Sequence, residues 1–217
     1  MKSNAQVDLM STILNKMKED NAEIHSKIIW FKEIAKIDET IKGRYSISFL
    51  LDSFFAFEND SLNIDEVMHE IRFLEGSEEA SRTKNATQFR RPPLKGLWHK
   101  HYFDRSIPAL AQNVKNALGN YGMPYFESMA EEDKASGEER FVTPEDLPHI
   151  VNDIVISNLQ RRQADQKTTG EWLIYAKHKN VNYFLCLAKH GEGDEQIRTR
   201  IDSTCIHEFP FLKSVLV

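Results

Sequence analysis

The chain has 217 residues, of which 41% are hydrophobic and 28% are charged, and these fractions are typical of a globular protein. It contains no run of about 18 apolar residues, so the sequence predicts no membrane-spanning helix. The formal net charge of −5 argues against a generally basic, nucleic-acid-coating protein. The two cysteines, Cys186 and Cys205, lie in apolar segments, which indicates free thiols and a cytoplasmic location rather than a disulfide framework.

The first 76 residues are predicted to be helical. Apolar residues recur at helical spacing from Val7 to Ile41, with a break expected near Asp20-Asn21. The segment 45–57 is apolar on nearly every side, which favours a buried central helix. Asn63 is a typical N-cap for a third helical segment that ends at Gly76. We therefore expect a helical region over residues 1–76.

The middle of the chain alternates between polar connections and helical signals. Region 77–126 contains a connection closed by Pro92-Pro93, an extended segment at 94–103, and a helix that Ser106 caps and Gly119 ends. Region 127–140 is rich in acids and poor in apolar residues, so we expect an exposed acidic loop there. Thr143 is then expected to cap another helix.

Region 141–217 adds β-structure to that helix. Two β-rich runs, 171–177 and 181–189, flank a short turn and predict a hairpin. Asp194 is expected to cap a short helix, and 205–211 is expected to be an edge strand that stops at Pro210. The fold class is α+β: a helical N-terminal part packed with a small antiparallel sheet formed mainly by the C-terminal third, in one compact domain.

Positive charge is concentrated in one part of the chain. Residues 81–116 carry eight lysines and arginines against the single acid Asp104, whereas acids outnumber bases on both sides of this segment. The basic residues are interleaved with aromatic residues and two histidines. This pattern predicts a local site for an anion, above all for phosphate, and RNA is the ligand that we consider first.

His99 and His101 are the candidate catalytic residues in this segment. In an extended segment, alternate side chains share a face, so both imidazoles should project together while Lys100 points away. One neutral imidazole could take a proton from a 2′-hydroxyl, and the other, as imidazolium, could protonate the leaving oxygen. Neighbouring cations would stabilise the developing charge. Alternatively, the segment is only anchored to the core by its aromatic residues, with His and Lys on a solvated surface.

Several further residues complete the predicted site. His190 is a possible additional catalytic histidine at the exit of the second β-rich run. The expected anion-binding or nucleic-acid-binding residues are Arg90, Arg91, Lys95, Lys100, Arg105, Trp98, Tyr102 and His178. A metal held by His99 and His101 is a weaker alternative, because no spacing singles out a third ligand among Asp104, His178, His190 and Asp194. We therefore expect no metal and no cofactor.

The sequence leaves three functions open. The first is a metal-independent nucleic-acid phosphodiesterase, a ribonuclease of the toxin-like kind, that uses a His/Arg/Lys site. The second is a non-catalytic binding or regulatory protein, such as an immunity-type partner, whose basic aromatic segment contacts RNA, another anionic ligand or an acidic protein. The third makes the amphipathic N-terminal helix an oligomerisation face. None of them involves a membrane.

Overall fold

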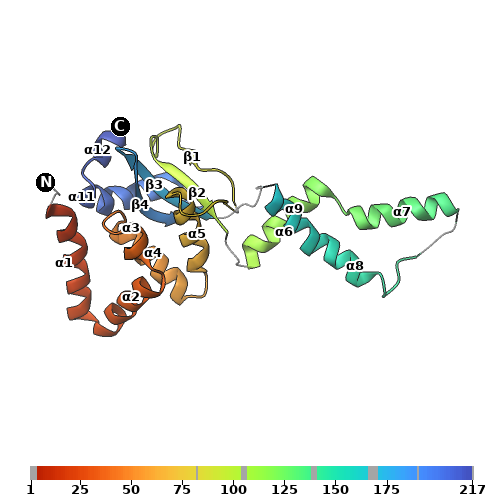
Figure 1. Ribbon diagram of the computed structural model, residues 1–217, viewed down its shortest axis with the longest axis horizontal. Helices are drawn as coiled ribbons and strands as arrows, with labels where there is room; N and C mark the ends of the chain where they lie inside the picture. The colour runs from red at the N-terminus through yellow and green to blue at the C-terminus, as the bar shows by residue number, and fades with distance from the viewer. Residues whose placement is uncertain are drawn as a thin grey trace.

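The computed structural model describes residues 4–81, 83–103, 107–137, 141–165, 171–189 and 191–216. It confirms an α+β fold, in which a four-stranded antiparallel sheet lies between N-terminal and C-terminal helices. A second group of helices forms an elongated arm that extends away from this body (Figure 1). The described elements thus form a compact body and a projecting arm. None of the described helices is long and apolar enough to cross a membrane.

The N-terminal helices begin where the sequence supplies caps. Asn21 accepts a hydrogen bond from the backbone N–H of Ile24 at 3.1 Å, which confirms the expected break. Ser46 caps the buried central helix in the same way, and Asn63 caps the next one as expected. The helices are α1 (Asn4–Asp20), α2 (Ala22–Ile34), α3 (Ile37–Ile41), α4 (Ile47–Glu58) and α5 (Ile64–Leu74).

The sheet has the strand order β1-β2-β3-β4, and every neighbouring pair is antiparallel. Its strands are β1 (Thr87–Gln88), β2 (Trp98–Tyr102), β3 (Glu171–His178) and β4 (Val181–Ala188). The hairpin of β3 and β4 confirms the sequence prediction. Its turn residues, Lys179 and Asn180, both have positive φ, as a two-residue type I′ turn requires. The extended segment expected at 94–103 is a strand only from Trp98 to Tyr102, because residues 92–96 form turns.

The two faces of the sheet have separate cores. Trp98, Tyr175 and Phe184 are aligned on the face that packs against the N-terminal helices. His99, Ile174 and Cys186 are aligned one position along and belong to the opposite face. There the C-terminal helices provide the cover, with apolar side chains that include those of Ile197, Ile201, Cys205, Phe209 and Leu212.

The predicted edge strand at 205–211 is wrong. From Asp194 the chain forms helices that are interrupted only by a turn at 209–211: α10 (Asp194–Arg200), the π-helical segment η2 (Ile201–Cys205), α11 (Ile206–Glu208) and α12 (Leu212–Val215). Ile197, Ile201, Cys205 and Phe209 recur every four residues and are all buried. That spacing places them on one helical face, which packs against the sheet.

The arm consists of α6 (Ile107–Tyr121), α7 (Pro124–Ser136), α8 (Leu147–Val151), the π-helical segment η1 (Asn152–Ser157) and α9 (Asn158–Ala164). The acidic loop predicted at 127–140 is wrong in its described part, because residues 127–136 belong to α7. Phe126, Met129 and Ala130 give this acidic segment the i, i+3, i+4 spacing of a helix.

Helix ends in the arm also differ from the sequence prediction. Gly119 lies inside α6, and Gly122, with φ +64°, follows the end of that helix instead. Ser106 lies outside the described residues. Thr143 precedes a turn rather than a helix. The backbone N–H and the hydroxyl of Thr143 both donate hydrogen bonds to the Asp146 carboxylate, each at 2.9 Å, and these bonds close the turn. The helix therefore starts at Leu147.

Candidate nucleic-acid interface

His99 and His101 lie side by side on one face of β2, as their spacing predicts. Their ring centroids are 5.6 Å apart. Lys100 points to the other side of the strand, where it forms an ion pair with Glu70. The strand thus places the two imidazoles on one face of the sheet and the Lys100 ammonium on the other.

The imidazoles form an aromatic cluster with Phe89 and Trp172. The His99 ring lies 4.7 Å from Phe89 and 5.0 Å from Trp172, and the His101 ring lies 6.4 Å from Trp172, between centroids. His99 is half-buried, whereas only 6% of the His101 surface is exposed. A ligand would therefore meet His99 before it reaches His101.

Lys100 is buried in a polar cluster rather than exposed for a ligand. Its Nζ lies 3.0 Å from the Glu70 carboxylate and donates hydrogen bonds to the Ser81 hydroxyl, the Thr83 hydroxyl and the Lys84 carbonyl. Burial lowers the pKa of Lys100, and the Glu70 charge opposes this shift. These contacts link α5 to β2, so the expected anion-binding role does not fit where the structure places this side chain.

The segment 89–97 between β1 and β2, called the cationic loop below, has a well-defined backbone. Phe89 N–H donates to the Leu97 carbonyl at 2.9 Å, and Gly96 N–H donates to the Phe89 carbonyl at 3.1 Å. The Arg198 guanidinium holds the Pro93 carbonyl at 2.7 Å. Gly96 has φ +96°, and a Cβ there would lie 2.7 Å from the Val215 carbonyl, so only glycine fits against α12.

The charged side chains of the cationic loop face solvent. Leu94 and Leu97 are fully buried and anchor the loop, whereas Arg90, Arg91 and Lys95 are exposed. Within the described part of the chain, none of these three cations forms an ion pair or a side-chain hydrogen bond. The structure therefore presents three unneutralised positive charges on a fixed backbone.

The remaining predicted residues are scattered. Trp98 is half-buried on the face opposite the histidines, with the Lys177 ammonium 4.2 Å from its ring centroid. Tyr102 is buried in the core beneath the N-terminal helices. His178 stacks on Phe211 at the hairpin tip, with 4.3 Å between centroids.

The structure does not bring His178 to the imidazole pair. His101 is aligned with Trp172 at the start of β3, and His178 ends that strand six residues later. At about 3.3 Å per residue, the separation along β3 is roughly 20 Å. Arg105 and His190 lie outside the described residues, so their roles stay predictions.

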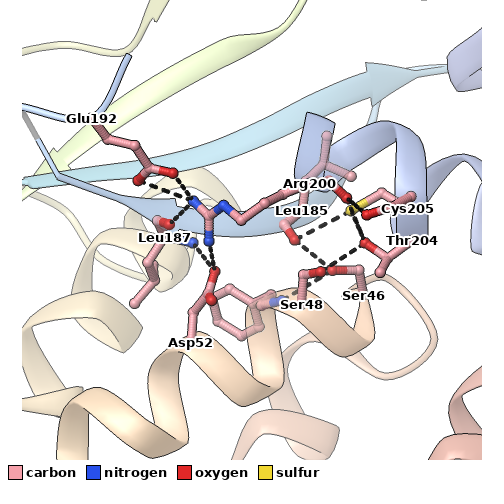
Figure 2. A network of polar contacts seen from close by, with 11 residues as sticks. Ser46, Ser48, Asp52, Leu185, Leu187, Glu192, Arg200, Thr204 and Cys205 are labelled. Atoms are coloured by element: carbon pink, nitrogen blue, oxygen red, sulfur yellow. Dashed lines mark hydrogen bonds and ion pairs between the residues drawn. The ribbon is translucent and has the colours of Figure 1, made fainter. Parts of the chain in front are cut away.

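A second polar network, which the sequence did not predict, lies along the outer edge of β4 (Figure 2). Arg200 lies 2.9 Å from the carboxylates of both Asp52 and Glu192 and donates to the Leu187 carbonyl at 2.9 Å. Asp52 accepts the Leu187 N–H at 3.1 Å. Burial raises the pKa of Asp52 to about 6, while the Arg200 charge acts in the opposite direction.

The same edge is covered further along by hydroxyl and thiol groups. The Ser46 hydroxyl and the Cys205 thiol both donate to the Leu185 carbonyl, and the Ser48 and Thr204 hydroxyls lie 2.7 Å apart. Together these side chains occupy backbone groups that an edge strand would otherwise expose. The network joins α4 to α10 and η2 around β4, so we interpret it as structural. An acid in the apolar helix α4 is the sequence signal that could have indicated it.

The described residues contain no group of three or more His, Cys, Asp or Glu side chains that could hold a metal ion. Comparisons with known proteins found no matching family model, no matching curated protein and no matching solved structure.

Proposed function

We propose that the protein binds nucleic acid through the cationic loop, with single-stranded RNA as the first ligand to test. The observation that carries this proposal is the exposure of Arg90, Arg91 and Lys95, without acidic partners among the described residues, on a loop whose backbone is held in place. Guanidinium groups bind phosphate oxygens in bidentate geometry, and a fixed loop loses little entropy on binding.

The distribution of charge supports a local site rather than a coating surface. The whole chain carries a net charge of −5, yet the cationic loop contains no acid. Three cations on one loop can contact only a few phosphates, so we expect moderate affinity that depends strongly on salt. A single phosphate backbone crossing the loop satisfies this arrangement.

The test is the affinity of a fluorescently labelled single-stranded RNA, measured by anisotropy. The variant Arg90→Ala/Arg91→Ala/Lys95→Ala should bind at least about tenfold more weakly than the native protein, because three phosphate contacts are lost. The matched control is Lys16→Ala/Lys18→Ala/Lys42→Ala, which removes the same charge from exposed positions elsewhere. Equal affinities of the two variants would contradict the proposal.

A second candidate function, phosphodiester cleavage, is favoured by one specific observation: the two imidazoles lie 5.6 Å apart on the strand that leaves the cationic loop. His99 as the neutral base would take the 2′-hydroxyl proton, and protonated His101 would deliver a proton to the leaving 5′-oxygen. The attacking 2′-oxygen would form a 2′,3′-cyclic phosphate as the phosphorus–oxygen bond to the leaving group breaks. Cations of the loop would stabilise the charge that develops on phosphate.

Cleavage is tested separately from binding. His99→Ala and His101→Ala should each abolish release of labelled fragments while RNA affinity is retained. His207→Ala, at an exposed histidine outside this cluster, should behave like the native protein. Unchanged cleavage in both cluster variants, or no cleavage by the native protein, would remove the catalytic function and leave the binding function standing.

A further inference from the structure

The outer part of the arm exposes apolar side chains that the molecule itself does not cover. All thirteen residues of α7 are described, and none of them is buried; the same holds for the five residues of α8. In residues 124–137 and 141–153, large apolar side chains have 37–80% of their surface exposed: Tyr125, Phe141, Val142, Leu147 and Val151. Exposed apolar residues in such a group indicate a surface that binds another protein.

Helices such as α7 and α8, which bury none of their residues, have little stability on their own. Isolated helices shorter than about 12–15 residues are marginal in water, and helices in proteins are stabilised chiefly by packing of an apolar face. Leu147 and Val151 are four residues apart and form such a face on α8. Both side chains are more than half exposed in the single molecule. A partner that covers it would therefore stabilise the arm.

The charge of the outer arm restricts the chemistry of that partner. The described residues 124–137 and 141–153 contain seven acids and one lysine. This charge repels nucleic acid and anionic lipid, and it favours a cationic surface. The chain itself carries such a surface, the cationic loop, whose three basic side chains are exposed and have no acidic partner in the part of the chain that the structure describes. In Figure 1 the arm points away from the body, so an arm meets this loop most readily on another molecule.

We propose that the outer arm of one molecule docks on the cationic loop of a second copy. In a two-fold dimer the contact occurs twice, because each arm then reaches the partner's body. The apolar residues of α8 provide burial, and the acids of α7 meet Arg90 and Arg91. This inference goes beyond the proposed function and does not depend on it, although both use the cationic loop.

Light scattering combined with size exclusion tests the oligomeric state. At roughly 100 µM, where a contact of micromolar affinity is saturated, the native chain should be a dimer. Leu147→Ser/Val151→Ser should be a monomer, and circular dichroism should show unchanged helix content, because neither side chain is buried in the single molecule. A monomeric native chain would overturn the proposal.

Charge reversal identifies the contacting surfaces. Glu131→Lys/Glu132→Lys and Arg90→Glu/Arg91→Glu should each be monomeric alone, because each places like charges in contact. A mixture of the two should form a heterodimer, in which both contacts again pair opposite charges. Arm variants should retain RNA binding, whereas loop variants lose it, which separates this inference from the proposed function. If both charge variants stay dimeric while Leu147→Ser/Val151→Ser is monomeric, the arms contact each other and the loop assignment is wrong.

Discussion

The buried ion pair of Lys100 and Glu70 gives a strong prediction for stability. Their side chains are 0% and 2% exposed, and Lys100 also donates to the Ser81 and Thr83 hydroxyls. Lys100→Met keeps most of the side-chain length but removes the ammonium that pairs with the buried Glu70 carboxylate. Breaking a buried pair in this way costs about 3–5 kcal/mol. At about 2–4 °C per kcal/mol for a chain of this size, the melting temperature should fall by roughly 6–20 °C.

Urea unfolding monitored by tryptophan fluorescence measures this cost, because Trp30, Trp98 and Trp172 all belong to the body. The double variant Glu70→Leu/Lys100→Met removes both charges, so it should be more stable than Lys100→Met by about 1–2 kcal/mol. It should still be less stable than the native protein, since two hydroxyls lose their donor. A loss below about 1 kcal/mol in Lys100→Met would refute the buried pair.

Three further predictions concern Glu208, the two cysteines and Arg200. Burial raises the pKa of Glu208 to about 7, so between about pH 4.5 and 7 the folded chain holds a proton that the unfolded chain has released. The native protein therefore loses stability as the pH rises through this range, and the free energy of unfolding of Glu208→Gln, measured in urea, should rise relative to the native value from pH 5 to 8. A constant difference would contradict this. Burial also raises the pKa values of Cys186 and Cys205, the latter to about 11. Alkylation of these thiols at pH 8, followed by mass spectrometry, should therefore be roughly 100-fold slower than alkylation of a free thiol, and it should become fast when urea unfolds the chain. Fast alkylation of the native protein would be inconsistent with these buried thiols. Arg200→Met should lower the free energy of unfolding by about 1–3 kcal/mol because charged hydrogen bonds are lost, and Arg200→Lys should have an intermediate stability. If Arg200→Met is as stable as the native protein, the Arg200 contacts do not stabilise the edge of β4.

The helix caps and the hairpin could be predicted because their signals are local. Asn21 and Asn63 accept hydrogen bonds from backbone N–H groups two or three residues ahead, and the Lys179-Asn180 turn needs only its own φ angles. The helix α7 was missed because its many acids resemble a solvated loop, although an acid-rich segment can be helical when small and apolar residues recur at the right spacing. The short helix expected from Asp194 is present as α10, but the helical residues at 205–208 were missed because aromatic residues near Pro210 resemble an edge strand, which conceals the four-residue spacing.

The candidate site was predictable only in its short-range geometry. Alternation along a strand places His99 and His101 on one face, but it gives no information on how deeply Trp172 covers them. Lys100 was assigned to the anion site because Glu70, thirty residues earlier, gives no sequence signal that it will face the lysine. Long-range pairs of this kind depend on the tertiary fold, which residue types and spacing do not determine.

The central claim is that the cationic loop contacts phosphates, and the salt dependence of RNA binding tests it most directly. For single strands, each neutralised phosphate contributes about 0.7 to the slope of the logarithm of affinity against the logarithm of salt concentration. Loss of Arg90, Arg91 and Lys95 should therefore make the slope shallower by about 2, while the Lys16→Ala/Lys18→Ala/Lys42→Ala control keeps the native slope. An unchanged slope in the loop variant would contradict the claim.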